Sequence, residues 1–409
     1  MDAGGRTFIF VCGRWDAELG VVDLSRALDP KNYGTDKAVI NRPRVTRDIG
    51  ASASGRAAAC GLPVSLAIAP DRIFVVNHGG NASPDETAKM PHGHAGTLAV
   101  LDLAKAIVAG QSALRQIVEL GCGGPVGCAL TPDGHLLVTS AEGEGTEDGG
   151  YRVAVISIEE TKRIRIHSLR HEGSPSPNPS PDRGFGRFPN PNAIAFASHS
   201  GGIVFTANGG TNDVSVLSFP AIMKGGAGAE IARIPVSSGP FGLALDADEN
   251  VLAVADREDA RTGLEGSCVS LIDTKRAVTA PARARLAQIR VGTDDAARPS
   301  RPTGVAFSPD GGSLYVTCAR SGTLSRLDMA AALAGRREEA RRVLRAARGE
   351  AAPRGVAVTP DGRFVVVAGG SRLGPRSGTL WILRTSDLSE AGRVTGIGNE
   401  PYSVGISIS

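Results

Sequence analysis

Apolar residues alternate with small or polar residues over short stretches of this chain, and the same arrangement returns along most of its length. Residues 301–328 show it clearly: Val305 and Phe307 alternate with smaller residues, a Pro-Asp-Gly turn follows, and Leu314 and Val316 repeat the period of two. A period of two is typical of a β-strand with two unlike faces. The stretch therefore predicts a strand, a turn, a second strand, a short Ser-Gly turn and a third strand.

A proline followed by a strand of small apolar residues occurs seven times. These repeats start 48 to 66 residues apart, which is long enough for about four short strands with their turns, the content of one propeller blade. They begin at Pro63, Pro125, Pro191, Pro240, Pro302, Pro353 and Pro401. Their small residues are expected where first strands crowd around a central axis.

The two ends of the chain complete the count of strands. Residues 8–13 and 19–25 match the second and third strands of a unit but lack a first, whereas residues 401–409 form a first strand with nothing after it. We expect the last strand to pair with the N-terminal strands, because ring closure removes open sheet edges. The sequence thus predicts an all-β fold, a seven-bladed β-propeller, as a single domain over residues 1–409.

Two kinds of segment interrupt the strands. Residues 171–191 carry several prolines, which exclude a regular helix and predict an extended loop between two blades. Single helical turns are expected after four of the third strands, at residues 23–30, 102–110, 218–226 and 328–336.

The repeat motifs resemble those of the YVTN-repeat propellers. The motifs that carry the resemblance are Pro-x-Gly before a small apolar strand, SPDG, LYVT and SGTLSRLD, and the likeness extends over about residues 7 to 409. More loosely, the chain is similar to the lactonase family with the same seven-bladed form. That resemblance implies His, Arg and Glu side chains at the channel mouth that open small anionic lactones. Under that reading His78 or Glu142 would act as general acid or base.

Composition adds limits on partners and location. Apolar residues make up 41% of the chain and aromatic residues 4%, and the net charge is +3. Such a charge gives no basis for nucleic-acid or membrane-surface binding, and aromatic residues are too few for base stacking. The six cysteines are scattered without a CxxC pair, and the N-terminus lacks the pattern of a secretory signal. We therefore expect reduced thiols and a cytoplasmic protein.

Candidate binding residues gather on one face of the predicted ring. Connections from second to third strands and from fourth to first strands share a face of a propeller, so residues at those points should surround the channel mouth. Those expected to bind a substrate are Arg14, Asn77, Asn192, Asn208, Arg257, Arg320, Arg354 and Tyr402. Converging arginines favour a small anion, since the guanidinium fork suits carboxylate or phosphate. The alternative is that they are solvated and paired with nearby carboxylates.

One connection concentrates histidines. His78, His92 and His94 lie within it, and three imidazoles can hold a divalent metal such as zinc, with Asp85 or Glu86 as a further ligand. The alternative is a polar loop without a metal, so the cofactor stays open. Two functions remain in view: binding or turnover of a small anion, in the lactonase manner, or a non-catalytic scaffold whose rim binds a protein partner.

Overall fold

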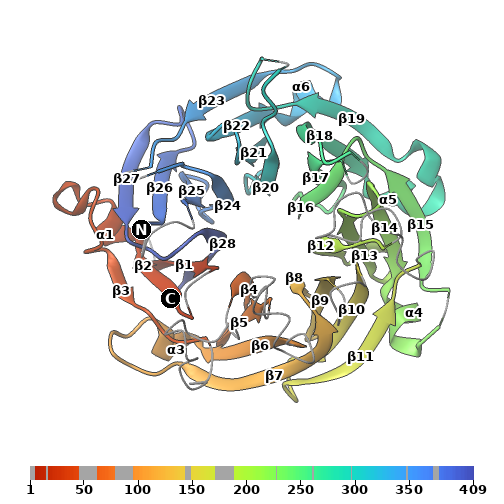
Figure 1. Cartoon of the computed structure of the whole chain (residues 1–409), viewed down its shortest axis with the longest axis horizontal. Helices are drawn as coiled ribbons and strands as arrows, with labels where there is room; N and C mark the ends of the chain where they lie inside the picture. The colour runs from red at the N-terminus through yellow and green to blue at the C-terminus, as the bar shows by residue number, and fades with distance from the viewer. Residues whose placement is uncertain are drawn as a thin grey trace.

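Seven four-stranded antiparallel sheets stand around a central opening (Figure 1). The computed structural model describes residues 5–14, 17–45, 62–78, 95–142, 149–170, 188–226, 228–259, 262–295, 297–346, 349–371 and 377–409. The seven predicted blades and the all-β fold are confirmed. Blade 1 has the order β28-β1-β2-β3, so the last strand of the chain forms the inner strand of the first blade, as expected.

The strands have the following bounds. Blade 1 contains β28 (Pro401–Ile408), β1 (Thr7–Gly13), β2 (Leu19–Asp23) and β3 (Val39–Asn41). Blade 2 contains β4 (Pro63–Ile68), β5 (Arg72–Asn77), β6 (Ala95–Asp102) and β7 (Leu114–Gly123), and blade 3 contains β8 (Pro125–Leu130), β9 (His135–Glu142), β10 (Gly149–Ser157) and β11 (Lys162–Ser168). Blade 4 contains β12 (Pro191–Ala197), β13 (Ile203–Asn208), β14 (Asp213–Ser218) and β15 (Glu230–Pro235).

The remaining blades repeat this pattern. Blade 5 contains β16 (Gly239–Leu245), β17 (Val251–Glu258), β18 (Glu265–Asp273) and β19 (Arg285–Arg290). Blade 6 contains β20 (Pro302–Phe307), β21 (Ser313–Cys318), β22 (Thr323–Asp328) and β23 (Glu339–Val343), and blade 7 contains β24 (Pro353–Val358), β25 (Phe364–Gly369), β26 (Thr379–Arg384) and β27 (Glu390–Thr395). Six of the seven inner strands begin at the repeated proline itself.

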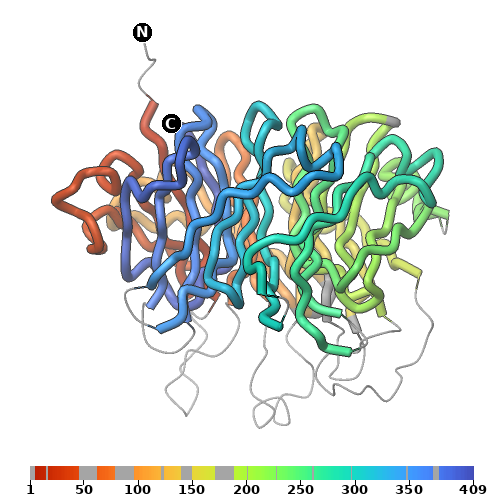
Figure 2. The backbone as a smooth tube through the Cα atoms, turned by 90° about the horizontal axis from the view of Figure 1, so that it is seen from above, coloured from red at the N-terminus to blue at the C-terminus, as the bar shows by residue number. Residues whose placement is uncertain are grey.

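Closure of the ring rests on a full strand pair. β28 and β1 run antiparallel from Thr7 opposite Ile408 to Gly13 opposite Pro401. Beyond β1, the backbone of Arg6 exchanges hydrogen bonds with Ser409. The start of β1 and the C-terminus therefore lie on one face of the ring (Figure 2).

Short helices follow third strands and are capped by the last residue of the strand. The four expected turns are α1 (Leu24–Ala27), α3 (Leu103–Ala106), α4 (Phe219–Lys224) and α6 (Met329–Leu333), and a fifth, α5 (Thr274–Thr279), was not anticipated. The carboxylates of Asp102, Asp273 and Asp328 accept hydrogen bonds from backbone N–H groups at 3.0, 2.8 and 2.8 Å. This N-capping explains why Leu-Asp and Ile-Asp end these strands.

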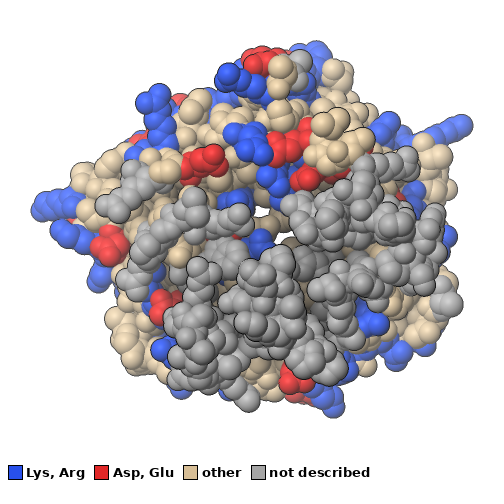
Figure 3. All heavy atoms as spheres, in the orientation of Figure 1, with Lys and Arg blue, Asp and Glu red and all other residues tan. Residues whose placement is uncertain are grey.

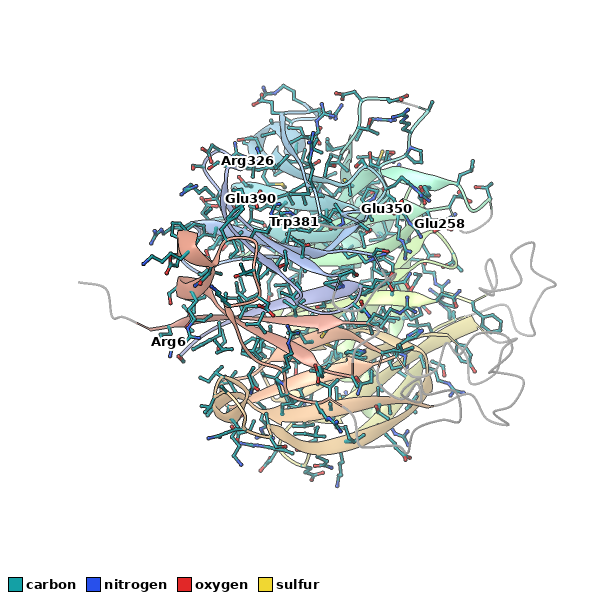
Figure 4. All side chains as sticks on the ribbon, turned by 60° about the vertical axis from the view of Figure 1, so that its left-hand side comes forward. Arg6, Glu258, Arg326, Glu350, Trp381 and Glu390 are labelled. Carbon is teal, nitrogen blue, oxygen red and sulfur yellow. The ribbon has the colours of Figure 1, made fainter. Side chains whose placement is uncertain are left out.

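The core lies between blades rather than within one of them. Phe205 and Val214 of blade 4 belong to the same buried cluster as Leu252 and Val254 of blade 5. Trp381 of blade 7 is fully buried against blade 6, and its indole nitrogen donates to the carbonyl of Arg345 at 3.4 Å (Figure 4). Since each blade buries its faces on its neighbours, no blade has a complete core alone.

Small residues are required where the inner strands meet. A Cβ on Gly304 would lie 2.2 Å from the carbonyl oxygen of Arg354, and one on Gly242 would lie 2.3 Å from that of Thr303. Backbone of the next inner strand thus occupies the space of a side chain. This is the physical reason for the small first strands in the sequence.

Three further observations bear on the earlier expectations. The cysteines whose side chains are described, Cys12, Cys128, Cys268 and Cys318, are free thiols. No helix among the described residues is long and apolar enough to cross a membrane. The proline-rich loop predicted for residues 171–191 falls largely on residues 171–187, outside the described part, and β12 already begins at Pro191.

Candidate anion-binding site at the channel mouth

The proline of each inner strand fixes which residue lines the channel mouth. The residue after the proline is part of the cavity wall in all seven blades, and the cavity has a volume of ≈180 Å³. The resulting ring consists of Val64, Val126, Asn192, Phe241, Thr303, Arg354 and Tyr402. One sequence position, repeated seven times, therefore composes the mouth.

The residue before the proline is a non-glycine residue with a left-handed backbone conformation in five of the seven blades, and this turn directs the chain into the inner strand. Asn190, Arg301 and Glu400 have φ of 47°, 55° and 46°, in the left-handed region that side chains other than glycine adopt at a cost. Leu62 and Ala352 share this conformation. Both Arg301 and Glu400 use it to place a charged side chain beside the mouth, as the contacts below show.

Two aromatic rings from distant blades meet across the axis. Phe241 of blade 5 and Tyr402 of blade 1 have their ring centroids 5.9 Å apart at an interplanar angle of 66°, an edge-to-face contact. Blades 6 and 7 separate these two blades on one side and blades 2 to 4 on the other. The contact therefore spans the channel mouth.

Three arginines from three blades stack on these rings. The guanidinium carbon of Arg257 lies 4.2 Å from the centroid of Phe241. Those of Arg14 and Arg354 lie 5.4 and 5.6 Å from the centroid of Tyr402. Stacking on an aromatic face is favourable for guanidinium and leaves the N–H edge of the group for other partners. The arrangement concentrates positive charge at the mouth of a narrow channel.

Arg354 is held in place by its neighbours. Its Nη2 lies 2.8 Å from Oε1 of Glu400, and Nη1 donates to the carbonyl oxygens of Ala352 and Gly370 at 3.2 and 3.3 Å. The side chain is one-fifth exposed. Such support pre-organises a cation for a ligand without a change of rotamer.

A chain of ion pairs extends outward from the mouth over blades 5 and 6. Glu258 lies 3.3 Å from Arg301, which lies 3.1 Å from Glu265. Glu265 in turn accepts from Nε and Nη2 of Arg320 at 2.8 and 2.7 Å. The hydrogen bonds from Arg320, with Arg301 and Arg257 nearby, lower the pKa of the Glu265 carboxyl against the effect of burial.

The surface view agrees with this distribution. Acidic and basic side chains lie side by side along the upper border of the central opening in Figure 3. Glu258 and Glu350 lie on one side of the ring, opposite Arg6 (Figure 4). Among the described residues, positive and negative groups thus both lie next to the opening.

The structure brings five of the predicted binding residues to the mouth. Arg14, Arg257, Arg354 and Tyr402 form the stacked cluster, and Asn192 belongs to the ring, with its Nδ2 donating to the carbonyl of Pro240 at 3.2 Å. These five come from four different blades, so their proximity follows from ring geometry alone.

The other predicted residues lie elsewhere. Arg320 is half exposed at the outer end of the ion-pair chain. Asn77 and Asn208 are fully buried inside their blades: Asn77 donates to the carbonyl of Val45 at 2.9 Å, and Asn208 donates to Ser215 at 2.7 Å. They hold segments of the chain together, Asn77 through a backbone carbonyl and Asn208 through a side-chain hydroxyl.

Of the predicted acid–base and metal-binding residues, the structure describes the side chain of His78 alone. His78 is 2% exposed, and its Nδ1 lies 3.1 Å from the carbonyl oxygen of Pro125, between blades 2 and 3. The backbone of Glu142 ends β9, while its side chain, like His92 and His94, lies outside the described residues. Within the described part, no three His, Cys, Asp or Glu side chains are arranged to hold a metal.

Two residues of the site were not predicted from the sequence. Phe241 and Glu400 were not singled out, although Phe241 occupies the same repeat position as Arg354 and Tyr402. Alignment of the seven prolines would have found Phe241. Nothing in the sequence pairs Glu400 with Arg354, because that contact joins two consecutive blades through their connections.

Comparison with known proteins supports the fold. No family model and no curated protein sequence matches the chain. It is similar in structure to a periplasmic gluconolactonase of Pseudomonas aeruginosa, with 17% identity over 99% of both chains and a TM-score of 0.69. It is also similar to a putative 6-phosphogluconolactonase of Bacteroides fragilis, with 11% identity over 100% of this chain and 99% of that one and a TM-score of 0.65.

A further solved structure agrees with these two. A putative 6-phosphogluconolactonase of Bacteroides uniformis has 12% identity over 99% of this chain and 100% of that one, with a TM-score of 0.64. The TM-scores and coverages establish a shared fold over the whole chain, and at identities this low they establish the fold alone. The similarity to YVTN-repeat propellers, which rested on sequence motifs, has no counterpart among these comparisons.

Proposed function

We propose that this protein binds a small anionic metabolite at the channel mouth and hydrolyses it in the manner of a lactonase. The observation that carries the proposal is the cluster of Arg14, Arg257 and Arg354 on the contacting rings of Phe241 and Tyr402. A positive group in a partly enclosed site attracts and orients an anion. The descriptions of the structural neighbours as gluconolactonases add support at the level of fold.

The reaction requires few groups. Water adds to the lactone carbonyl, the ring C–O bond breaks, and the hydroxy acid formed releases a proton near neutral pH. Arginine N–H groups aimed at the carbonyl oxygen stabilise the oxyanion that develops in the transition state. A second arginine can hold the anionic substituent of the substrate. The three stacked guanidinium groups supply both functions.

A carboxylate is the expected general base. Glu258 follows Arg257 in the chain, and its side chain is 18% exposed, compared with 9% for Glu400, which faces Arg354. We assign the base to Glu258 ahead of His78, since His78 is 2% exposed and directed at a backbone carbonyl. Glu142 is the alternative base in this proposal.

We also propose that the protein is cytoplasmic.

The direct test of turnover is proton release. Purified protein is mixed with glucono-1,5-lactone or its 6-phosphate, and the acid formed is followed with a pH indicator above the spontaneous rate. The proposal expects enzymatic turnover that Glu258→Gln reduces by about 100-fold or more, the contribution of a general base. Turnover that Glu258→Gln leaves intact removes Glu258 from the mechanism, and an absence of turnover favours the non-catalytic scaffold.

A binding measurement distinguishes a small-ligand site from a non-catalytic scaffold, whether or not the protein turns the ligand over. Arg354→Ala should weaken the thermal stabilisation by 6-phosphogluconate, because one charge-assisted contact is lost, while circular dichroism shows an intact ring. Removing such a contact costs about 1.5–3 kcal/mol of binding free energy. Equal stabilisation of the variant and the parent protein would contradict the assigned role of Arg354.

A further inference from the structure

A second cavity lies away from the channel. A groove of ≈530 Å³ is lined by the connection from β19 to β20 and by parts of blade 6. Small-molecule sites have volumes of roughly 300–1,000 Å³. The groove falls in that range, whereas the channel cavity of ≈180 Å³ falls below it.

Three arginines from separate segments border the groove. Glu265 engages Nε and Nη2 of Arg320, and Arg341 contacts Asp294 and the carbonyl of Gly292. These contacts hold both guanidinium groups in fixed positions. Arg298 is 85% exposed and lies 3.5 Å from Asp295, a weak surface pair. It is the cation with most freedom to turn toward a ligand.

The rest of the lining is apolar or carries hydroxyls. Val343 is 62% exposed on β23, and Pro299 also lines the groove. Ser321 and Thr323 share a hydrogen bond of 2.9 Å at its edge. Val343 is an exposed aliphatic side chain next to the exposed Arg298 and the ion-paired Arg320 and Arg341. This combination suits a ligand that has both an apolar body and an anionic group.

We propose that this groove is a second ligand site, which takes a small organic acid. Its carboxylate contacts Arg298, beside the ion-paired Arg320 and Arg341, and its apolar body covers Val343 and Pro299. This site is separate from the channel mouth. The chain from Arg320 through Glu265 to Arg301 lies between the groove and the mouth, so Arg320 belongs to the groove rather than to the arginine cluster on the axis.

Saturation-transfer NMR with benzoate tests the proposal, since it detects weak binding. Wild-type protein should transfer saturation to benzoate and much less to benzyl alcohol, which has the same ring without the charge. Arg298→Ala should weaken benzoate binding by about fivefold, the effect of one exposed charge contact. Arg283→Ala is the matched control, because Arg283 is exposed on another connection of blade 5 and should leave binding unchanged.

A charge reversal inside the groove sharpens the test. Val343→Asp should abolish benzoate binding in the groove by repulsion, and Val343→Thr, of similar size, should preserve it. Arg257→Ala, at the channel mouth, leaves the groove intact, so the part of the benzoate signal that Val343→Asp removes should persist in it. The proposal is overturned if wild-type protein gives no benzoate signal, if benzyl alcohol binds equally well, or if Arg257→Ala removes the signal while Arg298→Ala and Val343→Asp retain it.

Discussion

At the scale of single residues, Asp256 is a buried carboxyl group with a strongly raised pKa. It is fully buried near the end of β17 and accepts hydrogen bonds from Ser237 and Ser270 at 2.6 and 2.8 Å. Burial outweighs these bonds and the field of Arg285 and raises its pKa from 3.8 to about 7. The folded state therefore binds this proton more tightly than the unfolded chain does.

This raised pKa predicts a loss of stability with increasing pH. Between pH 3.8, the pKa of the unfolded chain, and about pH 7, the folded protein holds a proton that the unfolded chain has released. The contribution of Asp256 to the free energy of unfolding therefore falls as pH rises through that window and is lowest above it. Asp256→Asn should remove this component. From about pH 5 to about pH 8, the free energy of unfolding measured in urea should fall by on the order of 2 kcal/mol more in wild type than in the variant. Identical pH dependence in both proteins would exclude an ionising Asp256.

Glycines of the inner strands give a second prediction at this scale. Gly304→Ala would place a Cβ 2.2 Å from the carbonyl oxygen of Arg354, so two strands must move apart. We expect a loss of about 1–3 kcal/mol in the free energy of unfolding. In Gly312→Ala the nearest atom would lie 3.4 Å away, at the end of the Asp310 side chain, and stability should change little. Equal effects in chemical denaturation would show that the inner strands are less crowded than described.

At the scale of elements, the connection between β2 and β3 adds a second set of contacts that close the ring. Beyond the pairing of β28 with β1, Thr35 forms a parallel bridge with Val394 of β27. Glu390 accepts hydrogen bonds from the Tyr33 hydroxyl at 2.9 Å and from Arg393 at 2.6 and 2.8 Å. This group of side chains attaches blade 1 to blade 7 at their outer edges.

Breaking that attachment should weaken closure. Glu390→Gln removes the charge that holds Arg393, whose side chain is 21% exposed, and we expect a loss of about 1–3 kcal/mol in unfolding free energy. Glu338→Gln, at an exposed pair with Arg336, should cost less than about 0.5 kcal/mol. Denaturant unfolding of both variants measures the difference. A larger effect in Glu338→Gln would contradict a structural role for Glu390.

At the scale of the whole molecule, seven prolines were enough to predict seven blades and their closure, because each marks the start of an inner strand. The same prolines mark the channel ring, and they place Arg354 and Tyr402 correctly. Side-chain partners could not be predicted in this way. The contact of Phe241 with Tyr402 crosses the axis between residues 161 positions apart, and Arg320 turns outward because Glu265 of the adjacent blade holds it.

Calorimetric titration with 6-phosphogluconate, a stable product-like anion, tests directly whether the arginine cluster at the channel mouth binds an anion. We expect saturable binding by wild-type protein that weakens as salt is added. The affinity should fall at least about tenfold in the double variant Arg14→Ala/Arg257→Ala, the effect of losing two charged contacts. Arg283→Ala should bind like wild type. If wild-type protein does not bind this anion, or if the double variant binds it with undiminished affinity, the arginine cluster at the channel mouth is not the anion site.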